Sequence, residues 1–277
     1  MNPRQSIQLK RRITREARRL GANLVGYAPI TRWRTDATVP EPYWPQSIWP
    51  STQTVIVMGV PMLLPIIEST PSINYQELYA TANQLLDQMA FRLAAWLNEL
   101  GHASIYLTRD GYGSLDILRR KPVASFSHVW AGRHAGLGTI GLSHMLLSPG
   151  FGPRVRLVSV FTSATLPGDP LVKKELCNQC GLCARLCPVQ AFARVKGRRI
   201  ADMRKDPCTE RHLQLRRDNR FPCGICAKVC PIGADRLLYH RTNPRVYLHE
   251  EAGLGNNPDA AEYRGWNHLR AHGSGNP

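Results

Sequence analysis

All eight cysteines of this 277-residue chain lie between Cys177 and Cys230, and their spacing limits what that segment can fold into. The first run reads Cys177-x2-Cys180-x2-Cys183-x3-Cys187-Pro188, the spacing that holds bacterial cubane clusters. The second set is Cys208 followed by Cys223-x2-Cys226-x3-Cys230-Pro231, the same run with its first cysteine displaced upstream. No cysteine is left over, so the sequence predicts two [4Fe–4S] clusters and electron transfer.

The ligand sets follow from the way two-cluster proteins use such runs. The fourth cysteine of each run ligates the other cluster. We therefore expect cluster A to be held by Cys177, Cys180, Cys183 and Cys230, and cluster B by Cys187, Cys208, Cys223 and Cys226. Gly181 and Gly224 suit the tight loops around the clusters, because a positive φ costs glycine little.

Zinc sites and disulfides are the rival interpretations of eight cysteines. The three-cysteine x2-x2 run that ends in x3-Cys-Pro is not a zinc-finger spacing. Disulfides imply an exported chain, and residues 1–30 show no signal peptide. No run of 18 or more apolar residues occurs, so no membrane-spanning helix is expected. We expect a cytoplasmic protein, because thiolate ligands stay reduced there.

The rest of the chain is too long to serve only as a frame for two clusters. A two-cluster module needs a few tens of residues, here about 166–240, and residues 1–165 contain no cysteine. Residues 1–165 must therefore bury a core of their own, as a chain of this length permits. Residues 241–277 are polar and rich in Gly, Asn and Pro, which predicts an irregular tail.

The formal net charge of +16 indicates an anionic partner, such as nucleic acid, an acidic electron donor or a phosphate-bearing cofactor. The alternative is a generally basic surface that offsets the negative charge of the clusters. Stacking aromatics, which single-strand nucleic-acid binders interleave with basic residues, are absent from the basic runs. These runs comprise Lys10, Arg11, Arg12, Arg15, Arg18 and Arg19; Arg194, Lys196, Arg198, Arg199, Arg204 and Lys205; and Arg211, Arg216, Arg217 and Arg220.

Hydrophobic periodicity predicts alternating helices and strands in the first 165 residues. Helical spacing is expected over 6–20, 75–100 and 129–135, and buried strands over 23–27, 54–60, 103–107 and 154–161. Residues 31–50, rich in Pro and Trp, are expected to form an ordered loop. The strand–helix–strand order predicts an α/β layer fold.

One glycine motif matches the consensus sequence of a dinucleotide-binding fingerprint but lacks the expected structural context. Gly136-Leu-Gly138-Thr-Ile-Gly141 fits G-x-G-x-x-G, but a small-residue helical segment precedes it and residues 153–165 contain no acid. A nicotinamide site is therefore not expected.

The same segment resembles another family. His134-Ala-Gly-Leu-Gly-Thr-Ile-Gly141, the Leu146–Leu157 stretch with Ser-Pro149-Gly-Phe-Gly-Pro, and Val160-Phe-Thr162 lead directly into the cysteine runs. Together with residues 20–29 they resemble the epoxyqueuosine reductase and reductive dehalogenase superfamily of corrinoid iron–sulfur enzymes. The resemblance implies a nitroreductase-like α/β domain that binds cobalamin, followed by a two-[4Fe–4S] ferredoxin-like α+β module. It also implies that one cluster lies near the corrin and the other near the surface.

The resemblance suggests site residues by position. Epoxyqueuosine reductases carry an aspartate acid upstream of the glycine motif, whereas residues 121–128 here contain no carboxylate. His128, with a suitable ordinary pKa, and Tyr112, on a flexible loop, are the candidate proton donors. A structural histidine that caps the following helix, and a loop-anchoring tyrosine, are the plainer alternatives. Candidate corrinoid contacts are Ser127, Gly136, Gly138, Gly141, Ser143 and His144.

These expectations together favour an enzyme: an iron–sulfur, cobalamin-dependent oxidoreductase that performs a reductive cleavage, as epoxyqueuosine reductases or dehalogenases do. Its expected partners are a low-potential ferredoxin or flavodoxin and a small organic substrate or a tRNA. Two alternatives stay open. One is a non-enzymatic electron carrier or corrinoid-activating protein, which the large cysteine-free domain disfavours. The other is a nucleic-acid-binding protein with structural clusters, which the absence of a base-reading motif disfavours.

Overall fold

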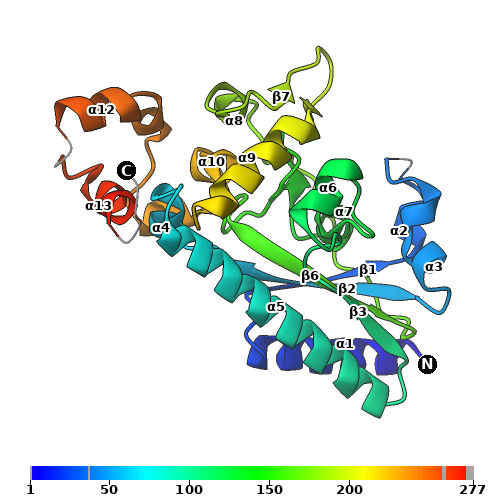
Figure 1. Cartoon of the computed structure of the whole chain (residues 1–277). Helices are drawn as coiled ribbons and strands as arrows, with labels where there is room; N and C mark the ends of the chain where they lie inside the picture. Colours follow the sequence, from blue (N-terminus) through cyan, green and yellow to red (C-terminus); the bar gives the residue numbers. More distant parts are fainter. Residues whose placement is uncertain (1, 37, 258–259, 273–277) are drawn as a thin grey trace.

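A four-stranded sheet forms the centre of the first domain in this computed structural model, which describes residues 2–36, 38–257 and 260–272 (Figure 1). Its strands are β1 (Leu24–Pro29), β2 (Thr54–Pro61), β3 (Ser104–Leu107) and β6 (Val155–Thr162), in the order β1-β2-β6-β3. All three pairings are antiparallel, with Tyr27 opposite Ile56 and Met58 opposite Val158. A mixed α/β fold is confirmed, although element order alone did not reveal the strand directions.

Helices cover both faces of this sheet. Helices α1 (Pro3–Arg19) and α5 (Ile73–Glu99) lie on one face, and α7 (His128–His134) lies on the other (Figure 1). Strand β2 shows the two resulting cores, because successive side chains of a strand point to opposite faces. Ile56 and Met58 join the core under α1 and α5, whereas Val55 and Val57 join the core under α7. Both faces of the sheet are therefore dry, which explains why β2 is buried along nearly its whole length.

Short elements complete the first domain. They are α2 (Thr31–Arg34), η1 (Glu41–Tyr43), α3 (Pro45–Ile48), α4 (Leu64–Glu68), α6 (Leu115–Arg120) and the two-stranded ribbon β4 (Thr139–Ile140) with β5 (Leu146–Leu147). The segment predicted as an ordered loop thus contains three short helices, two of which have a proline within their first two positions.

The cysteine-rich segment follows β6 and packs beside α4 and α6. It contains α8 (Leu182–Arg185), the ribbon β7 (Phe192–Ala193) with β8 (Asp202–Met203), α9 (Lys205–Arg217), α10 (Ile225–Lys228) and α11 (Asp235–Leu238). Helix α9 contacts α6, and α10 contacts α4. Most of the insertion that separates Cys208 from Cys223 belongs to helix α9. The expected domain boundaries after residues 165 and 240 remain predictions.

The prediction of an irregular tail was wrong for its described residues. Residues after Asn243 form η2 (Pro244–Leu248), α12 (Glu250–Asn256) and α13 (Arg264–Ala271). Tyr247, Tyr263 and Trp266 bury themselves against Val229 in a third apolar core. Three large aromatic side chains outweigh the helix-breaking composition of the segment, because burying each of them removes a large apolar area from water. The helices that the structure describes include none with the length and apolar character needed to cross a membrane.

Candidate functional site

The cysteines of the first set lie near the protein surface. Cys180 is exposed, and Cys177, Cys183 and Cys230 are half-buried. Burial and the neighbouring thiols of Cys230, Cys180 and Cys177 raise the pKa of Cys183 to about 11. The chain thus brings Cys230 back beside the first run, as the expected cluster A requires.

The loop around this set has the geometry that wraps a cluster. Gly181 has φ +78° and begins α8, and Gln179 donates its side-chain N–H to Cys177 Sγ at 3.3 Å. N–H groups aimed at thiolate sulfurs are a recognised way of stabilising an iron–sulfur centre.

The second set lies deeper in the molecule. Cys187, Cys208, Cys223 and Cys226 are all half-buried, and burial followed by Cys223 and Cys187 raises the pKa of Cys208 to about 11. Gly224 has φ +68°, and its missing Cβ makes room for the Tyr75 ring. Thr70 donates its hydroxyl to the carbonyl of Cys223. This set is thereby fixed to α5 and to the loop before it.

Eight thiols in two sets of four are the donor set that two cubane clusters require. Within the described part of the chain, no three Cys, His, Asp or Glu side chains are grouped closely enough for a single metal ion. A cubane instead needs thiolates around a core several ångströms across. The donor set therefore fits two clusters, and we propose the two ligand sets stated above.

One large pocket, of about 820 Å³, opens beside the second set of cysteines. All four of those cysteines line it, whereas none of the first set is among the described residues that do. Its walls are largely apolar and come from both domains: they include Val39, Phe126, Met145, Leu157, Val189, Phe192 and Ile225. The volume is within the usual range of cofactor and small-molecule sites. This position fits a redox group or substrate that exchanges electrons with cluster B.

A network of tyrosine and arginine side chains also lines this pocket. Arg156, on β6, donates to Asp110 Oδ1 at 2.7 Å and to Asn83 Oδ1 at 3.0 Å, and its guanidinium lies 4.5 Å from the centre of the Tyr79 ring. Tyr112 is hydrogen-bonded to Tyr79. Burial raises the pKa of Tyr112 well above its ordinary value, with Tyr79 and Asp110 adding to the rise and Arg156 opposing it.

Tyr112, one of the two predicted proton donors, therefore lies on the pocket beside a cation. Tyr79, Asn83 and Arg156 were not predicted from the sequence as site residues. Tyr79 and Asn83 lie four residues apart on one face of α5. This spacing of two polar residues was the only sign in the sequence that set them apart from core positions. Arg156 is the one charged residue of strand β6, which was the available sign.

His128, the other predicted donor, has a structural role in this arrangement. Its Nε2 lies 2.8 Å from the Thr108 carbonyl, which only accepts, so Nε2 bears the proton. Its Nδ1 lies 2.9 Å from the Ser159 hydroxyl and accepts from it. Burial lowers the pKa of His128 to about 4. With both nitrogens used and the ring neutral, His128 is poorly suited to donate a proton to a substrate, which favours the structural histidine over the acid.

The three predicted glycine contacts belong to the fold rather than to the pocket. A Cβ on Gly136 would overlap the Pro170 carbonyl, and one on Gly138 would overlap the Leu147 carbonyl. A Cβ on Gly141 would press on the Leu147 side chain at 2.9 Å. Close backbone packing explains these glycines, and none of the three lines the pocket. They are therefore withdrawn as corrinoid contacts.

The other three predicted contacts do line the pocket. Ser127 caps α7, and its hydroxyl accepts from the Trp130 N–H at 3.3 Å. Ser143 is buried at the pocket wall. His144, with φ +64°, donates from Nε2 to the Ala201 carbonyl at 2.6 Å and so joins the first domain to the cysteine-rich segment. These positions remain proposed contacts.

Comparisons with known proteins agree with this architecture. A model of the 4Fe–4S dicluster domain matches residues 174–234, a range that contains all eight cysteines. Two [4Fe–4S] clusters are therefore established for this segment.

Two groups of curated relatives match the chain. A tetrachloroethene reductive dehalogenase of Dehalobacter restrictus is 27% identical over 190 residues, which is 65% of this chain and 32% of the relative. An epoxyqueuosine reductase of Synechococcus sp. is 29% identical over 140 residues, which is 50% of this chain and 39% of the relative. The resemblance predicted from the sequence is thus confirmed. The chain spans about a third of the length of the curated dehalogenases that it matches.

Solved structures of both groups share the fold. The catabolic reductive dehalogenase NpRdhA matches with a TM-score of 0.65 at 20% identity, over 97% of this chain and 39% of that one. The epoxyqueuosine reductase of Streptococcus thermophilus matches with a TM-score of 0.56 at 17% identity, over 95% of this chain and 79% of that one. The α/β domain and the dicluster module therefore occur together in both groups.

Proposed function

We propose that this protein is a cobalamin-dependent iron–sulfur reductase that cleaves an organic substrate reductively. The observation that supports this most is the large pocket lined by the four cysteines proposed for cluster B together with Tyr112 and Arg156. Relatives from two reductase groups point to the same chemistry, and one structural neighbour is a dehalogenase whose structure suggests a mechanism for B12-dependent dehalogenation.

The residues of the pocket fit a corrinoid. The space is broad and mostly apolar, it adjoins the four cysteines, and Ser127, Ser143 and His144 offer polar contacts at its wall. When bound there, cobalamin would supply a cobalt centre that passes electrons from cluster B to the substrate.

The protein's own contribution is a proton and a fixed charge. A tyrosine hydroxyl is protonated at neutral pH, and burial raises the pKa of Tyr112 further, so its proton is present for the carbon or heteroatom that gains electrons. Arg156 lies beside Tyr79, which is hydrogen-bonded to Tyr112, and its charge favours the phenolate left after the proton has moved. Asp110 and Asn83 hold the guanidinium in place.

Titration of anaerobically reconstituted protein with cob(II)alamin, followed by EPR, tests the proposal. We expect a base-off cobalt spectrum at a stoichiometric ratio. Val123→Trp places bulk at an exposed residue of the pocket wall and should weaken binding at least tenfold. Leu171→Trp makes the same change at an exposed leucine outside the pocket and should leave binding unchanged. Two intact clusters with an unchanged cobalt spectrum would instead favour the non-enzymatic electron carrier.

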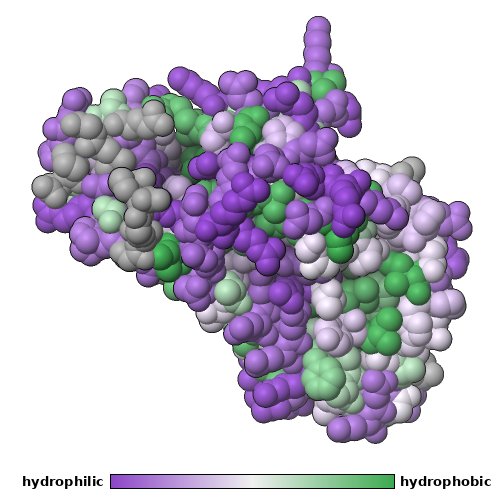
Figure 2. All heavy atoms as spheres, in the orientation of Figure 1, coloured by the Kyte–Doolittle hydropathy of each residue, from purple (hydrophilic) through white to green (hydrophobic). Residues whose placement is uncertain are grey.

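We also propose that an acidic ferredoxin or flavodoxin delivers electrons at the exposed edge of cluster A. Cys180 is exposed there, Arg194 donates to the Gln179 carbonyl at 3.2 Å, and Arg199 donates to the Cys177 carbonyl at 3.1 Å. Figure 2 shows hydrophilic residues over β7 and α9. Further exposed cations of the same segment are Lys173, Lys174, Arg185, Lys196 and Arg198. Such a field raises the association rate of an acidic protein.

Stopped-flow reduction by a reduced acidic ferredoxin tests this docking surface. The rate should fall steeply with ionic strength, and Arg194→Glu should slow it several-fold, because the charge faces the partner. Arg12→Glu, an equal reversal on α1, should leave the rate unchanged. Equal rates for all three proteins would overturn the docking proposal, and a basic surface that retains tRNA instead would favour the nucleic-acid partner. We propose the cytoplasm as the site of action, where the thiolates of such clusters stay reduced.

A further inference from the structure

Arg236 is a buried cation whose contacts are all with neutral groups. Its side chain is 2% exposed. The guanidinium donates to the carbonyls of Cys230 at 2.8 Å, Lys228 at 2.5 Å and Arg241 at 3.0 Å, and to the Tyr247 hydroxyl at 3.0 Å. Within the part of the chain that the structure describes, no carboxylate oxygen lies within ion-pair distance of it.

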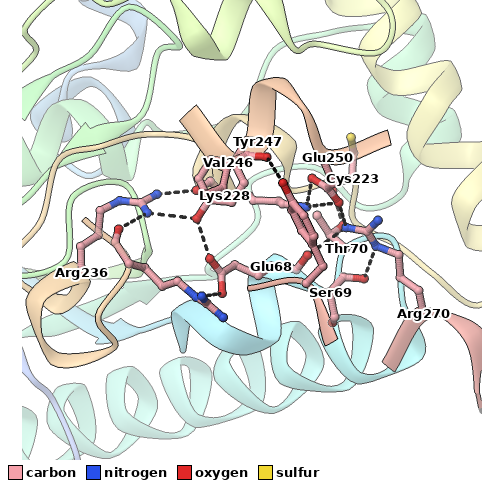
Figure 3. Close-up of polar contacts among 12 residues, drawn as sticks. Glu68, Ser69, Thr70, Cys223, Lys228, Arg236, Val246, Tyr247, Glu250 and Arg270 are labelled. Carbon is pink, nitrogen blue, oxygen red and sulfur yellow. Dashed lines mark hydrogen bonds and ion pairs between the residues drawn. The ribbon is translucent and has the colours of Figure 1, made fainter. Parts of the chain in front are cut away.

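The surrounding network does not supply the missing charge. Figure 3 shows Arg236 pointing toward Tyr247 and the backbone of Lys228. Glu250 is shared by Lys228, at 2.7 Å, and Arg270. Glu68 accepts from Arg241 at 3.2 Å and from the Tyr247 hydroxyl at 2.6 Å. Neither carboxylate of the described network therefore contacts Arg236 directly.

The nearby ion pair does not supply a carboxylate to Arg236 either. Asp235, adjacent in sequence to Arg236, is used by Arg154, whose Nε and Nη2 contact its two oxygens at 2.6 and 2.7 Å. A guanidinium taken out of water needs an anion close by, because neutral acceptors return only part of its lost hydration. The missing anion must come from something other than these carboxylates.

We infer that Arg236 is the counter-charge of cluster A and sets its reduction potential. The inference rests on the proposed ligation of cluster A by Cys230, whose carbonyl accepts the Arg236 Nε–H. A cubane held by four thiolates would be an anion, and Cys230, one of its proposed ligands, ends the short segment whose carbonyls accept from Arg236. Arg236 thus touches neither substrate nor cobalamin; it is a positioning residue that acts through the cluster.

The direction of the effect follows from charge alone. One-electron reduction by the donor protein adds one negative charge to the cluster, and a buried cation stabilises that reduced form. Removing the cation therefore makes reduction harder and lowers the midpoint potential. Removing a carboxylate from the network has the opposite sign, because it leaves more uncompensated positive charge.

EPR-monitored redox titration of the full, reconstituted chain tests the inference. Arg236→Met should lower the equilibrium constant for reduction of cluster A about tenfold, which is ~59 mV for a one-electron couple. Arg236→Lys keeps the charge and should leave the midpoint close to that of the wild type. Cluster B is the internal control, and its midpoint should move less than that of cluster A in every variant.

Glu68→Gln keeps the test decisive if Arg236→Met fails to assemble its clusters. The amide oxygen can still accept from Tyr247, while the lost charge should raise the midpoint of cluster A. An unchanged midpoint in both Arg236→Met and Glu68→Gln would overturn the inference, as would an equal fall in Arg236→Met and Arg236→Lys. A failure of the ligand proposal would be seen separately from an unchanged midpoint, because the wild-type protein would then not show EPR signals from two four-iron clusters.

Discussion

Arg154 and Asp235 form a fully buried, bidentate ion pair between the residue that precedes β6 and the first residue of α11. The remaining N–H groups of Arg154 donate to the carbonyls of Ala227, Cys230 and Ile232. A single side chain thus has all its donors satisfied while joining the sheet to the cysteine-rich segment. The pair positions the loop of cluster A relative to the sheet, and its burial makes it sensitive to the loss of either partner.

Replacing Arg154 by Met should destabilise the protein by ~3–5 kcal/mol, because Asp235 is left as an uncompensated buried charge. Chemical denaturation of the reconstituted protein under anaerobic conditions measures the change. The matched control is Arg198→Ala, which breaks an exposed pair with Asp202. Such surface pairs contribute ~0–1 kcal/mol. Equal losses in both variants would show that Arg154 has no special structural role.

The buried His128 predicts a loss of stability in mild acid. Its pKa is lowered from 6.5 to about 4, so the folded state holds the ring neutral while the unfolded chain protonates it. The stability is therefore fully present above pH 6.5 and is lost as the pH falls toward 4. Between pH 7.5 and 5 this single group should cost ~2 kcal/mol.

His128→Gln isolates that contribution, since other buried groups titrate in both proteins. The pKa of His134 and of His212 is likewise lowered to about 4 by burial, and both remain in the variant. Denaturation at the two pH values should show a smaller acid loss in His128→Gln than in the wild type. The same acid loss in both proteins would mean that His128 is protonated, which would reopen its candidacy as an acid.

The elements that sequence predicted well were those determined by local patterns. The apolar spacing over 75–100 corresponds to α5 at Ile73–Glu99, and the cysteine runs predicted a dicluster domain that a family model matches. The Arg156 site could not be predicted in this way, because Arg156 meets Asn83 and Asp110 only after α5 and the loop beyond β3 have packed against β6. The strand directions and the aromatic core of Tyr247, Tyr263 and Trp266 could not be predicted from local patterns either, because both depend on tertiary packing.

Gly138 offers a direct test of the conclusion that the glycine motif serves the fold. Gly138→Ala forces a Cβ onto the Leu147 carbonyl, which is backbone and cannot move aside. We expect a loss of more than ~3 kcal/mol or a failure to fold. Gly150→Ala is the control, because a Cβ there meets nothing within 4 Å. A stable Gly138→Ala protein with weakened cobalamin binding would return the motif to the cofactor site.

Tyr112→Phe should abolish turnover of a reducible substrate while cobalamin binding persists. The substitution removes only the hydroxyl, so the pocket keeps its shape and loses the proposed proton source. Loss of a positioned acid typically costs 10²–10⁴-fold in rate. Cobalamin EPR and single-turnover kinetics on the same preparation separate binding from chemistry. Tyr106→Phe, on β3 and outside the pocket, should keep wild-type turnover. Unchanged turnover in Tyr112→Phe would return Tyr112 to a loop-anchoring role.

Cys187→Ser tests the crossed pairing of the two cysteine runs. Cys187 belongs to the first run by sequence but lines the pocket with Cys208, Cys223 and Cys226. Crossed ligation predicts that the variant loses or converts cluster B and keeps the signal of cluster A. Cys180→Ser is the matched change at the exposed cysteine of the first run and should alter cluster A instead. If Cys187→Ser altered cluster A and spared cluster B, each run would hold its own cluster. The pocket would then adjoin an incomplete set of thiolates, and the proposed route of electrons from cluster B would need a different origin.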